Sequence, residues 1–390
     1  MESNCVQAKG TKLGENMRFV VTLLLALIVA PAWAAPIDDA AAANGRGDYA
    51  SELTITRPIA AKGEAWAQNN LGFMYANGHG VAQDYAEALK WYQLAAAQGN
   101  ARAQNNLGYL YANGHGVAQD YAEALKWYRL AAAQGNASAQ YNLGLRYDNG
   151  QGVEQDYGEA LKWYRLAAAQ GNARAQSILG AMYANGEGVE QDYPEAVRWY
   201  RLAAAQGNAL AQYNLGVRYD NGQGVARDDA EAVRWYRLAA AQGNAGAQTN
   251  LGLRYDSGQG VAQDYLEALN WYRLAAAQGN ARAQNNLGAM HYDGHGVPQD
   301  YTEALKWYRL AAAQGYPGAQ NNLGMMYAKG QGINLDDVRA HMWFNLAAAQ
   351  GDADAVWNRE ITARKMTPQQ MVEAQKLAQG CRVRSFKDCD

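Results

Sequence analysis

This 390-residue chain has only five histidines and three cysteines, and their spacing does not favour a metal site or a catalytic site. His291 and His295 stand four apart, a spacing that can place two zinc ligands on one helix face. Gly294 lies between them and indicates a helix end there. His79 and His115 occupy one equivalent loop position, and a site shared between them needs unusually close loops. We therefore predict no metal site.

Catalytic motifs are missing from the sequence as well. It contains no G-x-S-x-G nucleophile turn, no H-E-x-x-H zinc motif and no phosphate-binding glycine loop. An active site needs an asymmetric group of nucleophile, base and orienting residue, whereas this chain repeats the same residues along its length. We predict no catalytic residues and no cofactor. The formal net charge of −3 gives no general attraction to nucleic acid.

The N-terminus is typical of an exported protein. An apolar run over 19–30 is too short for a membrane span, and an A-x-A cleavage site follows at 32–34. We predict that residues 1–34 form a signal peptide region that is cleaved after Ala34, and Met17 is well placed to be the true start. An uncleaved signal anchor is the alternative. We expect a periplasmic or secreted chain with no stable membrane insertion after cleavage.

Two cysteines would remain in the mature chain. Cleavage removes Cys5 and leaves Cys381 and Cys389, which are eight residues apart. In an oxidising compartment they can close a small loop that adds about 2.5 kcal/mol locally. The pair is therefore a candidate disulfide, with two independent exposed thiols as the alternative.

One 36-residue unit recurs eight times over 67–354, with no insertion or deletion between copies. The copies begin at Ala67, Ala103, Ala139, Ala175, Ala211, Ala247, Ala283 and Ala319. A fixed period of this length is the signature of a solenoid, in which each unit is buried by its neighbours. This pattern overrides the expectation of two or three globular domains from length alone.

Each unit predicts two antiparallel helices. In the second copy the first helix (helix A) runs over about 101–112 and ends at a glycine turn, 113–116. The second (helix B) begins at a capping Asp120, with Glu123 placed to bond back to the cap, and stops at Gly135.

Helix B has an apolar surface that is too wide for packing on one side. In the first copy this surface comprises Tyr85, Ala88, Leu89, Trp91, Tyr92, Leu94, Ala95 and Ala96. We expect the tryptophans from Trp91 to Trp343 to supply the large buried side chain of each copy. A basic stripe through Lys126 and Arg129 is interpreted as a solvated outer face; attraction of an acidic partner or a polysaccharide is the alternative.

The repeated run A-x-x-x-L-G-x-x-Y-x-x-G-x-G-V-x-x-D-Y-x-E-A-x-x-W-Y-x-x-A-A-x-Q-G resembles the Sel-like repeat (SLR) family, relatives of the tetratricopeptide repeats. The resemblance covers 67–354 and implies an all-α fold, a right-handed α/α solenoid. It also implies an adaptor or scaffold role. Some cysteine-rich relatives are linked to β-lactam binding, but residues 35–380 contain no cysteine.

The two ends of the array are predicted to be capped. Residues 48–66 repeat helix B in degraded form, and 35–47 look like a flexible leader, so 35–66 form a leader and a half repeat. Residues 355–390 are expected to form capping helices and a tail. Their clearest helix, over 368–378, starts after the cap residue Thr367.

Several helix A positions vary between copies. Either a ligand selects the residues at these positions, or the positions are solvated and free to change. In tetratricopeptide-type arrays such positions line the concave groove, so the resemblance implies a partner-binding groove there. The candidates are Arg102, Tyr109, Tyr141, Arg146, Asp148, Arg174, Tyr213, Arg218, Asp220, Arg254, Asp256 and Arg282. The arginine and aspartate of one copy are two apart and do not face each other on a helix, so any pairing must cross between copies.

These observations favour an exported, non-catalytic adaptor that binds a protein or peptide in its groove. The first alternative is a binder of cell-envelope polysaccharide or peptidoglycan. A cryptic hydrolase of the β-lactamase kind is the third class.

Overall fold

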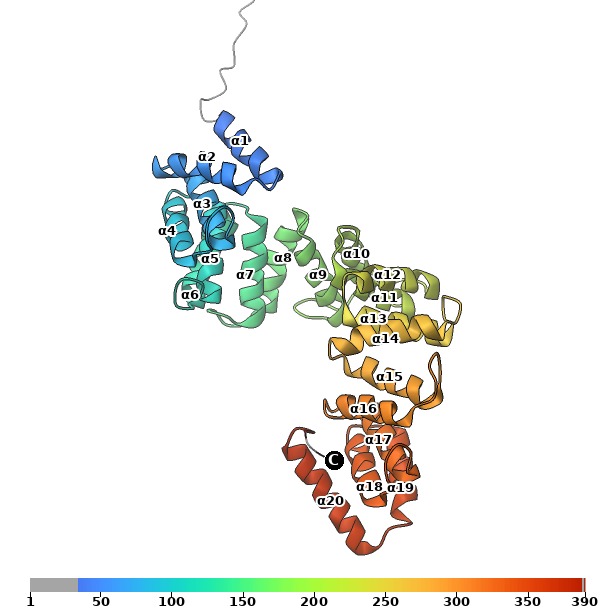
Figure 1. Ribbon diagram of the computed structural model, residues 1–390. Coiled ribbons are helices and arrows are strands. Elements are labelled where there is room, and N and C mark those ends of the chain that lie inside the picture. Colours follow the sequence, from blue (N-terminus) through green and yellow to red (C-terminus); the bar gives the residue numbers. More distant parts are fainter. Residues whose placement is uncertain (1–33, 388, 390) are drawn as a thin grey trace, which may run out of the picture.

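The chain forms an elongated, curved stack of helical hairpins (Figure 1). This computed structural model describes residues 34–387 and Cys389. That part of the chain contains twenty α-helices and no strand. The expected all-α solenoid of eight repeats is confirmed. The predicted signal peptide, 1–34, lies outside the described residues except for its last one.

The hairpins alternate between A and B helices along the chain. The A helices are α3 (Ala65–Asn77), α5 (Ala101–Asn113), α7 (Ala137–Asn149), α9 (Ala173–Asn185), α11 (Ala209–Asn221), α13 (Ala245–Ser257), α15 (Ala281–Asp293) and α17 (Pro317–Lys329). The B helices are α4 (Tyr85–Ala97), α6 (Tyr121–Ala133), α8 (Tyr157–Ala169), α10 (Tyr193–Ala205), α12 (Asp229–Ala241), α14 (Tyr265–Ala277), α16 (Tyr301–Ala312) and α18 (Asp337–Ala348).

Local capping sets where these helices begin and end. The Asp120 side chain accepts a hydrogen bond from the backbone N–H of Glu123 at the start of α6, and an aspartate caps each of the other B helices in the same way. The Glu123 side chain does not bond back to the cap as expected; it accepts instead from Lys126 and from Trp127 Nε1. Gly114 ends α5 in the left-handed conformation, at φ 69°.

A tyrosine–glycine contact joins the two helices of each hairpin. An ideal Cβ on Gly144 of α7 would lie 2.8 Å from the ring of Tyr164 on α8, closer than real side chains come. The equivalent contact recurs in every repeat, with phenylalanine in the last, at 2.5 to 2.8 Å. The glycine therefore lets the two helices approach until the ring fills the gap. Burial raises the pKa of these tyrosines, that of Tyr200 to about 12, so their hydroxyls stay protonated.

Two expectations about helix B were wrong. In the first seven repeats the fully buried ring is the tyrosine, and the tryptophans from Trp91 to Trp307 are only half-buried. In the eighth repeat both Phe344 and Trp343 are buried. Leu94 is also not part of the buried surface, because half of it is exposed. Its seventh equivalent, Leu346, is buried to 1 % exposure because a further helix covers it.

The N-terminal end of the stack is closed by two helices. Residues 35–47 are not a flexible leader: α1 (Ala34–Gly45) packs against α2 (Tyr49–Ala61). The sequence pattern showed no core residues there because half of the residues of α1 are alanine. Asp48 caps α2 by accepting from the N–H of Ser51, as its match to the other helix B caps predicted.

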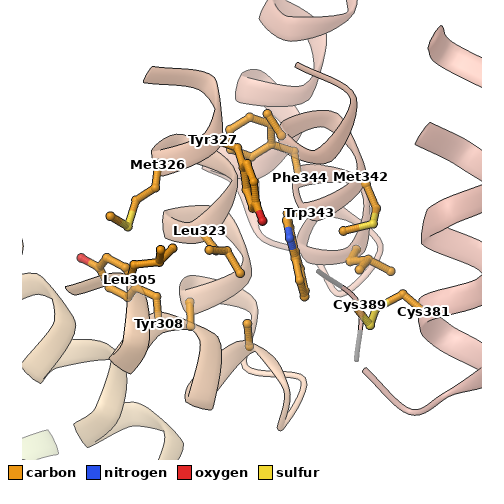
Figure 2. Packing of buried hydrophobic residues seen from close by; sticks show 14 of the residues in the cluster. Leu305, Tyr308, Leu323, Met326, Tyr327, Met342, Trp343, Phe344, Cys381 and Cys389 are labelled. Carbon is orange, nitrogen blue, oxygen red and sulfur yellow. A yellow bond between two sulfur atoms is a disulfide. The ribbon is translucent and has the colours of Figure 1, made fainter. Parts of the chain in front are cut away.

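At the other end, α19 (Ala353–Ala363) continues the stack and α20 (Pro368–Val383) folds back onto α18 (Figure 1). Thr367 and Gln370 form a reciprocal capping box at the start of α20. Cys381 and Cys389 form a disulfide that packs with Met342 of α18 in the same apolar cluster (Figure 2). The terminal cap is thereby tied to the last repeat.

Gly144→Ala is expected to lower the free energy of unfolding by about 1–3 kcal/mol, because its methyl group would force Tyr164 out of place. Gly380→Ala in α20 is the matched control: no neighbour lies within 4 Å of its added Cβ, so helix propensity should raise stability by up to about 1 kcal/mol. Thermal and urea unfolding measure both. Equal effects would contradict the close-approach explanation.

Candidate partner-binding trough

Asparagine side chains connect neighbouring A helices along one face of the array, here named the A face. Asn106 Nδ2 of α5 donates to Asn69 Oδ1 of α3 at 3.2 Å, and Asn142 Nδ2 donates to Asn105 Oδ1 at 3.0 Å. The same bridge recurs between α15 and α17 and between α17 and α19. The A face therefore presents a row of carboxamide groups, each of which both donates and accepts hydrogen bonds.

Three connected hollows open on the N-terminal part of this face. The first, of 490 Å³, is lined by Ala41, Asn44, Glu52, Asn69, Asn70, Phe73, Arg102, Asn105, Asn106, Asn136 and Ser138. The second, of 260 Å³, is lined by Phe73, Ala76, Asn77, Tyr85, Tyr92, Asn106, Tyr109 and Leu110. The third, of 420 Å³, is lined by Asn105, Tyr109, Ser138, Tyr141, Asn142, Asn172, Ala173 and Arg174. They share residues at each junction, and together we name them the N-terminal trough.

Four of the predicted groove residues lie together in this trough. Tyr109 stands between the second and third hollows with half its surface exposed. Arg102 lines the first hollow, and Tyr141 and Arg174 line the third. Because Arg102 and Arg174 are exposed while the rings stand beside carboxamides, the trough offers positive charge, aromatic surface and hydrogen-bonding groups at once.

Two further candidates lie on later A helices, away from these hollows. Tyr213 packs beside the buried Tyr236, with ring centres 6.1 Å apart. Arg282 is exposed and donates a long hydrogen bond of 3.4 Å to Asn250. A smaller hollow of 230 Å³ opens between α15 and α17, and neither residue lines it.

The remaining candidates lie at contacts between repeats. Arg254 of α13 is 7 % exposed and donates to the carboxylate of Asp220 on α11 and to Gln259. The Tyr236 hydroxyl also donates to Asp220, at 3.1 Å. This ion pair crosses between copies, as the spacing requires of any pair between these positions. It lies buried in the stack, where a ligand does not reach it.

Arg146 and Arg218 have no such carboxylate in the copy before them. Each guanidinium instead stacks over a tyrosine of the preceding B helix: Arg146 lies 5.4 Å from the ring centre of Tyr121 and Arg218 lies 5.3 Å from that of Tyr193.

Asp148 and Asp256, the other two carboxylates of this set, accept hydrogen bonds from Tyr164 and Tyr272 at 3.0 and 3.4 Å. Burial raises the pKa of both carboxyls, and the tyrosine hydrogen bonds partly oppose it. The side chains of Arg146, Arg218, Asp148 and Asp256 are thus used in contacts between helices.

Several trough residues were missed by the sequence-based list. The carboxamide position of Asn70, Asn106 and Asn142 is the same in most copies, so variation between copies could not single it out. Asn44 and Glu52 belong to α1 and α2, which the repeat pattern did not place beside the groove. Their only signal is that the half repeat precedes the first complete copy.

The histidines act as packing groups. His79 and His115 stack on Tyr49 and Tyr85 of the preceding B helices, with ring centres 4.0 and 4.5 Å apart. Nowhere in the described part of the chain do three His, Cys, Asp or Glu side chains gather around a metal-sized space. Among the helices between residues 34 and 387, none is long and apolar enough to cross a bilayer.

A stack of like helical hairpins of this kind defines a helical-repeat protein, an α-solenoid. The chain belongs to the Sel1 repeat family, whose model matches residues 67–100, 101–136, 137–172, 173–208, 209–244, 245–280, 281–316 and 317–352. Sel1 repeat proteins are generally non-catalytic scaffolds for protein interactions.

Two solved structures are similar to this chain. A Sel1 repeat protein from Oxalobacter formigenes is 36% identical; the match covers 63% of this chain and 96% of that chain, with a TM-score of 0.57. A protective antigen of uropathogenic Escherichia coli strains that displays an SLR fold is 34% identical, over 87% of this chain and 89% of that one, with a TM-score of 0.46. No curated protein matches the sequence.

Arg254→Met is expected to lower the unfolding free energy by about 3 kcal/mol, because it leaves the Asp220 carboxylate buried without its cation. The array supplies a precedent for the double change, because Ala76 of repeat one and Leu110 of repeat two occupy the two facing positions, also 34 residues apart. The double change Arg254→Met with Asp220→Ala should recover most of the loss. A double-mutant cycle by thermal unfolding checks this, and purely additive effects would refute the coupling.

Proposed function

We propose that this chain is an exported scaffold that binds a protein partner through an extended segment lying in the N-terminal trough. The observation that carries the proposal is the continuity of the three hollows, with Phe73 and Tyr109 as exposed rings and asparagine carboxamides beside them. Carboxamides match the alternating donors and acceptors of a peptide backbone. Exposed rings supply contact area at low conformational cost.

The charges of the trough add selectivity for the partner. Arg102 and Arg174 are exposed at the first and third hollows, and neither forms an ion pair within the described residues. An acidic side chain of the partner can therefore pair with either. Such pairs at a solvated rim steer association and register more than they add affinity.

The polysaccharide alternative gains nothing from the basic stripe. Arg129 donates to the hydroxyl of Tyr147 on the next A helix, and three later arginines make the same bond. Lys126 pairs with Glu123, and its equivalents in five other copies do likewise. The Lys126-type positions of the stripe are thus paired with carboxylates, and its arginines are held by tyrosine hydroxyls while keeping their charge.

A positional-scanning library of C-terminally amidated pentapeptides, labelled at the C-terminus, tests the trough. We expect pools rich in aromatic and acidic residues to bind the purified chain, and Tyr109→Ala to weaken binding by about ten-fold or more. Arg129→Ala on the B helix stripe is the control and should change nothing. Fluorescence polarisation measures both. Binding that is indifferent to Tyr109, or co-sedimentation with peptidoglycan and no peptide binding, would count against the proposal.

Export rests on two features: the apolar run and A-x-A site at the N-terminus, and the Cys381–Cys389 disulfide, which is typical of an oxidising compartment. The bridge packs into the core of the last repeat, so reduction would loosen the C-terminal cap. We place the mature chain in the periplasm.

Thiol alkylation in intact cells tests the export proposal. With Cys5→Ser as the background, the chain bearing residues 1–34 is expected to resist maleimide labelling until reductant is added. A variant without residues 2–34 stays in the reducing cytoplasm and should label at both cysteines. Equal labelling of the two variants would argue against export.

A further inference from the structure

The first hollow of the trough is closed at its outer end by helices that do not belong to any complete repeat. Ala41 and Asn44 come from α1 and Glu52 comes from α2, while the other lining residues come from the first three repeats. At 490 Å³ the hollow has the size of a small-molecule site, roughly 300–1,000 Å³. The trough therefore has a defined end, where a bound peptide chain would have to end or turn away into solvent.

Glu52 places a carboxylate in this end wall. The residue is 3 % exposed, and its Oε2 accepts a hydrogen bond of 2.8 Å from Asn44 Nδ2. Its Oε1 receives no hydrogen bond from the described residues. A buried carboxylate is costly unless it is paired and hydrogen-bonded, and here a single neutral amide serves it. The hollow is the side from which a cation can reach the free oxygen.

Arg102 supplies the opposite charge on the same hollow. Within the described residues it forms no ion pair with Glu52. The carboxamides of Asn69, Asn105 and Asn106 line the hollow with them. The Glu52 carboxylate and the Arg102 guanidinium line one hollow without pairing with each other. They can therefore bind a ligand that carries a positive charge at one end and a hydrogen-bond acceptor nearby.

The second hollow continues the trough beyond that charged end. Phe73 belongs to both hollows, and past it stand Tyr92, Tyr109 and Leu110. These side chains line a recess of 260 Å³ together with Asn77 and Asn106, next to the charged end. The order along the trough is thus carboxylate, carboxamides, then a recess with aromatic walls.

We propose that the first hollow binds the free N-terminus of a peptide or protein partner. The α-ammonium group bonds to Glu52 Oε1, the first peptide groups bond to the asparagines, and an apolar side chain enters the recess between Phe73 and Tyr109. The inference rests on the proposed function and adds the polarity of the bound chain. A single carboxylate among the lining residues suits an ammonium group rather than a metal ion, which needs several ligands.

The test compares pentapeptide amides with free N-termini, the same peptides N-acetylated, and acetylated peptides that carry one lysine. Acetylation removes the ammonium charge, so binding should weaken by about ten-fold or more, and a lysine ammonium should not restore it. Glu52→Gln should weaken the free peptides to a similar degree and leave the acetylated ones unchanged. Glu123→Gln, an equal change on a B helix, is the control.

Further measurements distinguish a misfolded Glu52 variant from a wrong proposal. The glutamine at position 52 can still accept from Asn44, and slow hydrogen–deuterium exchange of the α1 and α2 backbone amides reports that the two helices stay packed. Acetylated peptides that bind as tightly as free ones, with binding still dependent on Tyr109, would overturn this inference and leave the trough intact. Free phenylalanine binding as tightly as the peptides would also overturn it. Absence of all peptide binding would remove both proposals.

Discussion

The structure depends on the contact between a glycine in each A helix and an aromatic ring of its B helix. Gly108 and Tyr128 illustrate it: the ring lies where the Cβ of any other residue would be. The contact sets how close the two helices of a hairpin come, and small alanines beside the ring let the next hairpin come equally close. Because eight hairpins share one geometry, they stack regularly, and the A helices form a continuous face instead of separate patches.

A stack of like units leaves core surface open at both ends, and this chain closes its ends differently. At the C-terminus, Met342 stands where the other copies have an outward lysine, arginine or asparagine, and Leu346 is covered by α20 and the disulfide-bonded tail. At the N-terminus, alanine-rich α1 covers α2 and brings Asn44 beside Glu52. The two caps therefore stabilise the array and also make one end of the trough chemically distinct.

Variation between copies has more than one physical cause. Arg102, Tyr109 and Arg174 vary on an exposed face, where a ligand can select them. Arg254 varies inside the stack, at a position that methionine or leucine fills in other copies. Its charge is accommodated because the preceding copy carries Asp220, and Arg146, which lacks that neighbour, stacks on a tyrosine instead. Pattern comparison cannot separate these cases, since it sees the substitution and not what it faces.

The sequence alone was enough to recognise the repeat, the two helices of each hairpin, their capping residues and the family. They depend on local signals, Asp120 before a helix and Gly114 after one, repeated often enough to exclude chance. The folded chain was needed to show that Tyr128 and not Trp127 is the buried ring, that Leu94 stays exposed, and which varying residues share a hollow. The reason is that burial depends on which side chains the partner helix, the neighbouring hairpin and the caps cover, and the repeat pattern does not record this. Helix α1 and the Glu52 wall of the trough are the clearest case, because alanine-rich segments carry almost no sequence signal for what they cover.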